Sequence, residues 1–278
     1  MKKYIITGGL GFVGSHLVEK LVMLNHKVII IDNFSSGKTE NIKKVKKKVK
    51  IIKADISKQG NWAKYFKGID TVVHLAAMAD IVPSINNPRS YFNTNVKGTL
   101  NVLENSRKFN IKKFIYAASS SSYGIPKKYP TNEKEILDPK YPYSLSKKLG
   151  EDLVLHWGKV YKLKVISLRF FNIYGERSRT SGTYGAMFGI FLAQKIHGKP
   201  YTVVGNGKQK RDFTYVTDVA EAIVKTMKLK KNHQVINIGS GGCYSVNYIV
   251  KLLGGKKIYI PKRPKEPEVT WANIQKAK

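Results

Sequence analysis

A glycine-rich turn near the start of this chain constrains its fold more than any other feature. An apolar run at residues 4–7 leads into GGLGFVG and then into residues 11–24, where apolar positions recur at helical spacing. Residues 28–32 form a second apolar run that ends in the carboxylate Asp32. The order strand, helix, strand predicts a βαβ unit with two parallel strands.

The alternation of strands and helices continues along the chain. Apolar runs predict strands at 50–53, 71–74, 113–117 and 165–169, and periodic segments predict helices at about 88–109 and 143–161. Such strands are typical of a parallel sheet that is covered on both faces and binds ligands at the carboxyl ends of its strands. We therefore expect an α/β fold, with a Rossmann-type doubly wound parallel sheet in residues 1–170.

The pattern becomes less regular after residue 171. A loop rich in Gly, Ser, Arg and Thr at 175–185 is followed by a helix to Ile196, a short strand at 201–204 and mixed segments. We expect residues 171–278 to form mainly a smaller C-terminal substrate-binding region, with some segments returning to the Rossmann core.

The glycine turn predicts a dinucleotide site, because glycines let the backbone approach a pyrophosphate and the helix N-terminus attracts its charge. Asp32 is spaced to meet the adenine ribose hydroxyls and would repel the 2′-phosphate of NADP. We expect NAD as the cofactor. The expected contacts in this unit are Gly8, Gly11, Phe12, Val13, Gly14, Asp32 and Asn33.

Asp55 and Ile56 follow the third predicted strand and are candidates for contact with the adenine edge. An ordinary helix cap is the alternative interpretation of Asp55.

Tyr143 and Lys147 are four residues apart, so a helix presents their phenol and ammonium groups on one face. A phenol with a pKa of about 10 is a poor base at neutral pH, and a nearby cation favours the phenolate. Four serines, at 119–122, follow the strand predicted at 113–117. A hydroxyl there could bind a substrate oxygen, and a polar turn is the alternative.

Composition argues against several other classes of protein. The formal net charge is +32, but the excess lysines are spread along the chain, which favours a solvated surface over specific nucleic-acid binding. The dense lysine run at 43–53 could still bind a phosphate-rich partner, and that alternative stays open. Cys243 is the only cysteine and the six histidines lack paired ligand spacing, so neither a disulfide nor a metal site is expected. We expect a cytoplasmic protein without membrane insertion.

With these residues in place, the chain resembles the extended short-chain dehydrogenase/reductases, specifically their nucleotide-sugar epimerase and dehydratase branch. The resemblance covers nearly the whole chain. It rests on TGGLGFVG, Asp32, HLAA at 74–77, NVKGT at 95–99, SSSSYG at 119–124, YSLSK at 143–147, RFFNIYG at 169–175 and RDF at 211–213.

The resemblance implies a role for each matching position. Ser119 resembles the catalytic Ser/Thr, Tyr143 the base, and Lys147 the residue that tunes the base and holds the nicotinamide ribose. Asn172 resembles the asparagine near the sugar diphosphate, and Arg211 and Arg263 resemble the arginines that clamp it. Further implied cofactor contacts are Leu75, Ala76, Ala77 and Asn95, and further implied substrate contacts are Ser120, Ser121 and Thr270.

The implied reaction is NAD-dependent 4-epimerisation of a UDP-sugar, UDP-Glc/UDP-Gal or UDP-GlcNAc/UDP-GalNAc, through a 4-keto intermediate. Dehydratases of this branch place Asp-Glu after the catalytic Thr, whereas this chain has Ser120 and Ser121, which disfavours 4,6-dehydration. A UDP-uronate-acting epimerase or decarboxylase stays an alternative. A non-catalytic NAD-binding regulator or nucleic-acid binder is the alternative outside enzymes.

Two further expectations come from the resemblance. Thr270 takes the position of a size gate before Trp271, and a small gate leaves room for an N-acetyl group. Relatives continue beyond the segment that resembles 273–278, so the chain resembles a member truncated at its C-terminus. Because members of this branch often dimerise through helices that flank the sheet, we expect a homodimer.

Overall fold

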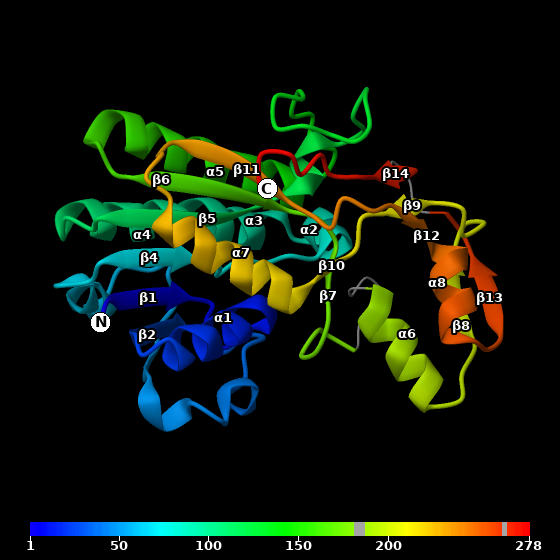
Figure 1. The fold of residues 1–278 in the computed structure, drawn as a ribbon, viewed down its shortest axis with the longest axis horizontal. Helices are drawn as coiled ribbons and strands as arrows, with labels where there is room; N and C mark the ends of the chain where they lie inside the picture. Colours follow the sequence, from blue (N-terminus) through cyan, green and yellow to red (C-terminus); the bar gives the residue numbers. More distant parts are fainter. Residues whose placement is uncertain (181–186, 263–265) are drawn as a thin grey trace.

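The computed structural model describes residues 1–180, 187–262 and 266–278. Its main body is a sheet in the order β11-β6-β5-β4-β1-β2-β3, and all neighbouring strands in it are parallel. This is the expected doubly wound sheet (Figure 1). The strands are β1 (Lys3–Thr7), β2 (Lys27–Asp32), β3 (Lys50–Lys53), β4 (Thr71–His74), β5 (Lys113–Ser119), β6 (Val165–Phe170) and β11 (Gln234–Ile238).

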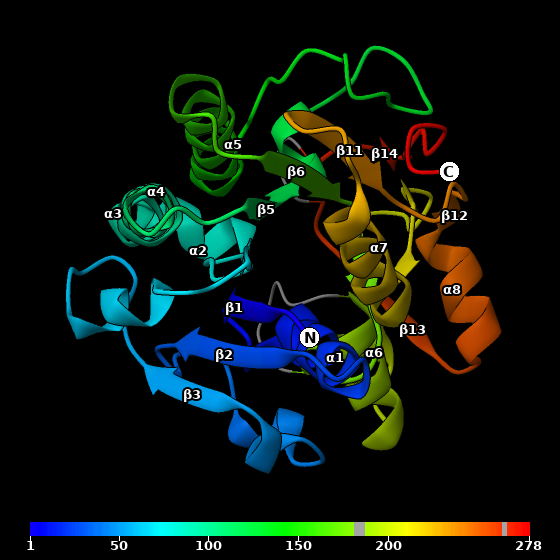
Figure 2. The same cartoon turned by 60° about the vertical axis from the view of Figure 1, so that its left-hand side comes forward.

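Helices cover both faces of the sheet, as Figure 2 shows from the side. α1 (Phe12–Met23) and α7 (Val216–Lys228) lie on one face, and α4 (Gly98–Lys108) and α5 (Pro142–Tyr161) lie on the other. Successive residues of a strand point to opposite faces. Accordingly, Ile6 belongs to the core under α1 and α7, while Ile5 belongs to the core under α4 and α5.

The element boundaries differ from the predicted ones in ways that affect the site. β5 continues to Ser119, so this serine is the last residue of the strand. The helix predicted at 88–109 is divided into α3 (Pro88–Phe92), a π-helical turn (Asn93–Lys97) and α4. α2 (Ile81–Asn86) was not predicted. Short 3₁₀ helices occur at Thr39–Ile42, Lys46–Lys48, Asn61–Phe66 and Ser120–Tyr123.

The chain leaves the sheet after β6 and returns to it through α7 and β11, which pairs with β6. Between and after these returns it forms a smaller region with a core of its own, built on Phe191, Tyr201, Val203, Val246 and Val250. The elements of this region are α6 (Met187–Ile196), β8 (Tyr201–Val204), α8 (Val246–Leu253) and β13 (Lys257–Ile260), with β8 and β13 paired in parallel.

Two small sheets connect this region with the carboxyl ends of the main strands. β7 (Ile173–Tyr174) pairs with β10 (Thr214–Tyr215), and β9 (Lys210–Arg211) lies between β12 (Tyr244–Ser245) and β14 (Val269–Thr270). The pairing of β9 with β14 sets Arg211 opposite Thr270. Segments distant in sequence are thereby brought to one edge of the main sheet.

Arg263 and part of the loop predicted at 175–185 lie outside the described residues. No helix in the described parts of the chain combines the length and the apolar character needed to cross a membrane.

Candidate active site

The glycine turn joins β1 to α1 at the carboxyl edge of the sheet. Gly8 has a φ of +68°, and a Cβ there would lie 2.8 Å from the Cα of Ala76. A Cβ on Gly14 would lie 2.2 Å from the carbonyl oxygen of Gly8, so its absence lets α1 pack on the turn. Gly11 caps α1 without a side-chain hydrogen bond. The N–H groups of Phe12 and Val13 in the first turn therefore fit a pyrophosphate.

Asp32 ends β2 beside this turn and is buried. Its carboxylate accepts hydrogen bonds from the backbone N–H groups of Leu10, at 3.0 Å, and Phe34, at 2.9 Å. A Cβ on Gly37 would lie 2.9 Å from both carboxylate oxygens, so this glycine keeps that side of the carboxylate open. Gly37 was not predicted as a site residue, although it lies in the same loop. The arrangement suits contact with ribose hydroxyls.

The other candidates near the adenosine end have local partners. Asn33 accepts a hydrogen bond from the N–H of Ser35. Asp55 accepts two from Ser57, one from its backbone and one from its hydroxyl, in a turn that does not begin a helix. The side chain of Ile56 is buried in the core under α4 and α5.

The residues that follow β4 form the far wall of the cofactor turn. Leu75 donates its N–H to the carbonyl of Thr7, and Ala77 follows Ala76 along this half-buried segment. The side chain of Asn95 bonds to the backbone of Met78 in both directions and donates to Ser146 Oγ at 2.9 Å. Asn95 therefore ties this segment to α5.

Ser119 and Tyr143 meet where β5 ends beside the start of α5. Ser119 Oγ lies 2.8 Å from Ser121 Oγ, and both hydroxyls lie close enough to the Tyr143 phenol to influence its pKa. Burial raises the pKa of Tyr143; the Ser119 hydroxyl opposes this, the Asp80 carboxylate adds to it, and Ser121 opposes it. Burial, rather than the charge of Lys147, is therefore the main influence on this phenol.

Lys147 lies one turn further along α5 and is buried, with its Nζ 4.3 Å from the centroid of the Tyr116 ring. Burial lowers the pKa of Lys147 to about 7, and the nearby Glu151 carboxylate partly opposes this. Lys147 can therefore gain or lose its proton near neutral pH, one helical turn from Tyr143 in the chain.

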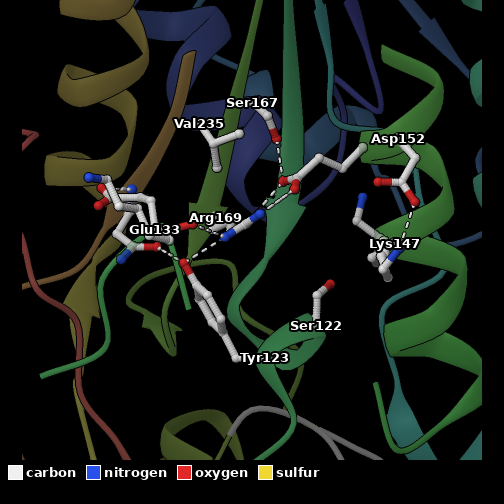
Figure 3. A network of polar contacts seen from close by, with 12 residues as sticks. Ser122, Tyr123, Glu133, Lys147, Asp152, Ser167, Arg169 and Val235 are labelled. Carbon is white, nitrogen blue, oxygen red and sulfur yellow. Dashed lines mark hydrogen bonds and ion pairs between the residues drawn. The ribbon is translucent and has the colours of Figure 1, made fainter. Parts of the chain in front are cut away.

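A buried network of polar side chains holds this part of α5 against β6 and β11 (Figure 3). Glu151 accepts hydrogen bonds from Ser167 and Arg169, with Arg169 Nη2 at 2.5 Å from Glu151 Oε1. Arg169 also donates to the Tyr123 hydroxyl at 2.8 Å, and Tyr123 in turn donates to Asn237. The network joins α5, β6, β11 and the turn that holds the four serines at 119–122, here called the serine turn. It was not predicted, because Glu151 and Asn237 carry no motif of their own.

The expected substrate residues Asn172, Arg211 and Thr270 are held by contacts among the small sheets. Asn172 donates to the carbonyl of Asp212 at 3.1 Å and to Thr270 Oγ1 at 2.7 Å. The buried Arg211 donates to Glu266 Oε1 at 2.8 Å. Ser120 lies in the 3₁₀ turn beside Ser121.

Across the described ranges, no group of three or more His, Cys, Asp or Glu residues could hold a metal ion. The features that are present are a glycine turn before a helix, a buried acid after the second strand, and a Ser-Tyr-Lys group at the carboxyl edge. Together with the doubly wound sheet they define an NAD-binding enzyme of the short-chain dehydrogenase/reductase class.

Comparison with known proteins narrows this class. The profile of the NAD dependent epimerase/dehydratase family matches residues 4–239, and the chain belongs to that family. It is an NAD-dependent nucleotide-sugar epimerase family enzyme.

Three relatives illustrate the similarity. A putative UDP-glucose 4-epimerase of Methanocaldococcus jannaschii is 36% identical over 98% of this chain and 90% of its own length. The structure of a UDP-N-acetylglucosamine 4-epimerase from Methanobrevibacter ruminantium, in complex with UDP-N-acetylmuramic acid, has a TM-score of 0.94 at 33% identity, covering 99% of this chain and 90% of that one. A UDP-glucuronic acid 4-epimerase from Bacillus cereus, with UDP-glucuronic acid and NAD, has a TM-score of 0.92 at 32% identity, covering 99% and 91%.

Proposed function

We propose that this protein interconverts gluco- and galacto-configured UDP-sugars by 4-epimerisation, with NAD retained between turnovers. The serine turn carries the proposal. Ser119 Oγ and Ser121 Oγ lie 2.8 Å apart and close enough to the Tyr143 phenol to lower its pKa, and the turn holds hydroxyls where a dehydratase needs an acid for proton transfer at C5 and C6. A hydroxyl turn suits oxidation and reduction at C4 alone.

In the proposed reaction Tyr143 takes the proton of the C4 hydroxyl, while Ser119 holds the C4 oxygen. Bound NAD would supply the hydride acceptor, and in its reduced form the hydride donor, for C4. Lys147 holds the nicotinamide ribose, Asp32 holds the adenine ribose, and the N-terminus of α1 holds the pyrophosphate. Asn172 and Arg211 keep the UDP diphosphate in place while the 4-keto sugar rotates in the site, so either face of C4 can be reduced.

We propose that the sugar site accepts N-acetylated sugars as well as UDP-Glc. Thr270 is short, half-buried and fixed by its hydrogen bond from Asn172. A Thr270→Tyr change should fill the space that an acetyl group needs. We expect the rate on UDP-GlcNAc to fall at least tenfold more than the rate on UDP-Glc, because an overpacked site costs more than ~1.4 kcal/mol. Thr270→Ser is the control, and equal effects of Thr270→Tyr on both sugars would exclude this gate.

UDP-glucuronic acid is a second candidate substrate, because the Bacillus cereus relative covers nearly the whole chain. We also propose that the enzyme is a cytoplasmic homodimer.

The proposed reaction is tested by incubating the purified protein with UDP-Glc, UDP-GlcNAc and UDP-GlcA in separate tubes without added NAD. Proton NMR then follows the anomeric and C4 signals. A galacto-configured product in any tube supports epimerisation with retained NAD and identifies the sugar. Absence of product in all three tubes, before and after NAD is added, would contradict the proposal.

A further inference from the structure

His74 ends β4 and lies in the middle of a row of buried polar groups behind the cofactor turn. Its side chain is 1% exposed. Nδ1 lies 2.7 Å from Thr7 Oγ1, and Nε2 lies 2.9 Å from Thr99 Oγ1. Both neighbours are fully buried, so water does not compete for these hydrogen bonds.

The position of each proton follows from the partners of Thr99. Its Oγ1 lies 2.6 Å from the carbonyl oxygen of Asn95, which can only accept a hydrogen bond. The single hydroxyl proton of Thr99 is therefore on that bond, and Thr99 must accept from His74. Nε2 of His74 consequently carries hydrogen. The nearby Tyr116 hydroxyl donates its own proton to the backbone carbonyl of Lys147 at 3.3 Å.

The other side of the ring gives a consistent result. Thr7 Oγ1 accepts the N–H of Ala76 at 3.2 Å, so its own proton is free to be donated to Nδ1 of His74. Protonation of Nδ1 would leave the Thr7 hydroxyl without that acceptor and would bury a second cation near Lys147. Burial and the charge of Lys147 lower the pKa of His74 to about 3.

The row continues from Asn95 to the catalytic helix. The Asn95 side chain donates to Ser146 Oγ at 2.9 Å, and Ser146 donates to the backbone carbonyl of Tyr143 at 2.7 Å. One series of buried hydrogen bonds thus links the residue before the glycine turn, the segment after β4 and the residue proposed as the base.

We propose that His74 is a positioning residue, held as the neutral Nε2–H tautomer, that fixes the cofactor turn relative to α5. The expected effect of His74 on turnover rests on the proposed function. The expected protonation state of the His74 ring and the expected amount of retained NAD do not.

The first test uses the wild-type holoenzyme labelled with ¹⁵N-histidine. Long-range ¹H–¹⁵N NMR distinguishes the two neutral tautomers and the imidazolium. We expect one of the six histidines to stay neutral with hydrogen on Nε2 from about pH 5 to pH 8, a range in which an ordinary histidine titrates. A histidine spectrum in which every neutral ring carries hydrogen on Nδ1, or every ring titrates in this range, would overturn the inference.

The second test compares Thr99→Val with Thr99→Ser. Valine is close to threonine in shape and leaves Nε2–H without its acceptor, whereas serine keeps the hydroxyl. We expect Thr99→Val to lower the amount of retained NAD per chain and to lower kcat about tenfold, with little change in KM for the sugar. Thr99→Ser should keep the NAD content and the kcat of the wild type.

Equal NAD content and equal kcat in the two Thr99 variants would overturn the positioning role. A wild-type protein that holds NAD and shows the Nε2–H tautomer but turns over no sugar would contradict only the proposed function. If Thr99→Val does not fold, the wild-type spectrum and the NAD content of Thr99→Ser decide, and loss of NAD in the serine variant would overturn the role.

Discussion

At the scale of single residues, the two proposed proton-handling groups are shifted in opposite directions. Burial raises the pKa of Tyr143 and lowers that of Lys147, so in the free protein both side chains favour their neutral forms. A neutral phenol cannot accept a proton, so Tyr143 must lose its own proton before it takes that of the C4 hydroxyl, and a charged Lys147 nearby favours the phenolate.

The lowered pKa of Lys147 makes stability depend on pH. Its folded value is about 7 against an ordinary 10.5, so between these values the unfolded chain binds the extra proton and stability rises with pH. We expect the free energy of unfolding of NAD-free Lys147→Met to exceed that of the wild type most below pH 7. This difference should shrink as the pH rises toward about 10.5. Urea unfolding at several pH values measures it, and a difference independent of pH would contradict the assignment.

Glu266 is placed to oppose the binding of a diphosphate. It accepts a hydrogen bond from Arg211, the residue proposed to clamp the UDP diphosphate, and a phosphate must replace it there. We expect Glu266→Gln to tighten the binding of UDP about tenfold, because a competing charge-assisted hydrogen bond is removed. Titration calorimetry with UDP measures the change.

The matched control for this variant is Glu268→Gln. Glu268 lies two residues after Glu266, and its carboxylate forms an exposed ion pair with Lys262. It should leave the Kd for UDP nearly unchanged. Weaker binding by Glu266→Gln would show that Glu266 supports Arg211 instead of competing with its ligand.

At the scale of elements, α5 carries two proposed catalytic residues and is anchored by the ion pair of Glu151 with Arg169. Both side chains are almost fully buried, at 3% and 5% exposed. Such a pair is costly to break from one side, because the remaining charge stays buried and unpaired.

We expect Glu151→Gln to lower the free energy of unfolding by about 3 kcal/mol. Adding Arg169→Met should recover part of this loss, because the unpaired charge is removed. Urea unfolding of the two single variants and the double variant gives the coupling. Glu221→Gln, which breaks the exposed pair with Lys20, should cost less than about 1 kcal/mol. Equal costs for Glu151→Gln and Glu221→Gln would contradict the role given to the buried pair.

The elements of the main sheet could be predicted because their patterns are local. β3 and β4 match their predicted ends, since each is a short apolar run with clear flanks. α7 was described only as part of a mixed segment, although Val216, Val219, Ala220 and Ile223 have helical spacing and are buried. β11 could not be placed in the sheet from sequence, because its partner β6 is more than sixty residues away.

At the scale of the whole molecule, segments separated by long stretches of chain complete the site. Ser119 and Tyr143 could be paired from motifs, and the structure brings them together where β5 ends beside the start of α5. The contact of Asn172 with Thr270 spans 98 residues and depends on the small sheet of β9, β12 and β14, whose short strands leave no periodic pattern. The row of hydrogen bonds through His74 was likewise not predicted, because its residues lie on β1, β4, α4, α5 and the π-helical turn before α4.

The central claim is that C4 is oxidised and reduced by one retained NAD. It is tested most directly with the reactive UDP-sugar carrying deuterium at C4, incubated with the holoenzyme in ordinary water. We predict that the epimer formed keeps its deuterium at C4, because the same hydrogen is removed and returned within the site. The Tyr143→Phe variant should keep its NAD and lose at least about a hundredfold in rate. A product whose C4 deuterium has been replaced by solvent hydrogen would contradict the account.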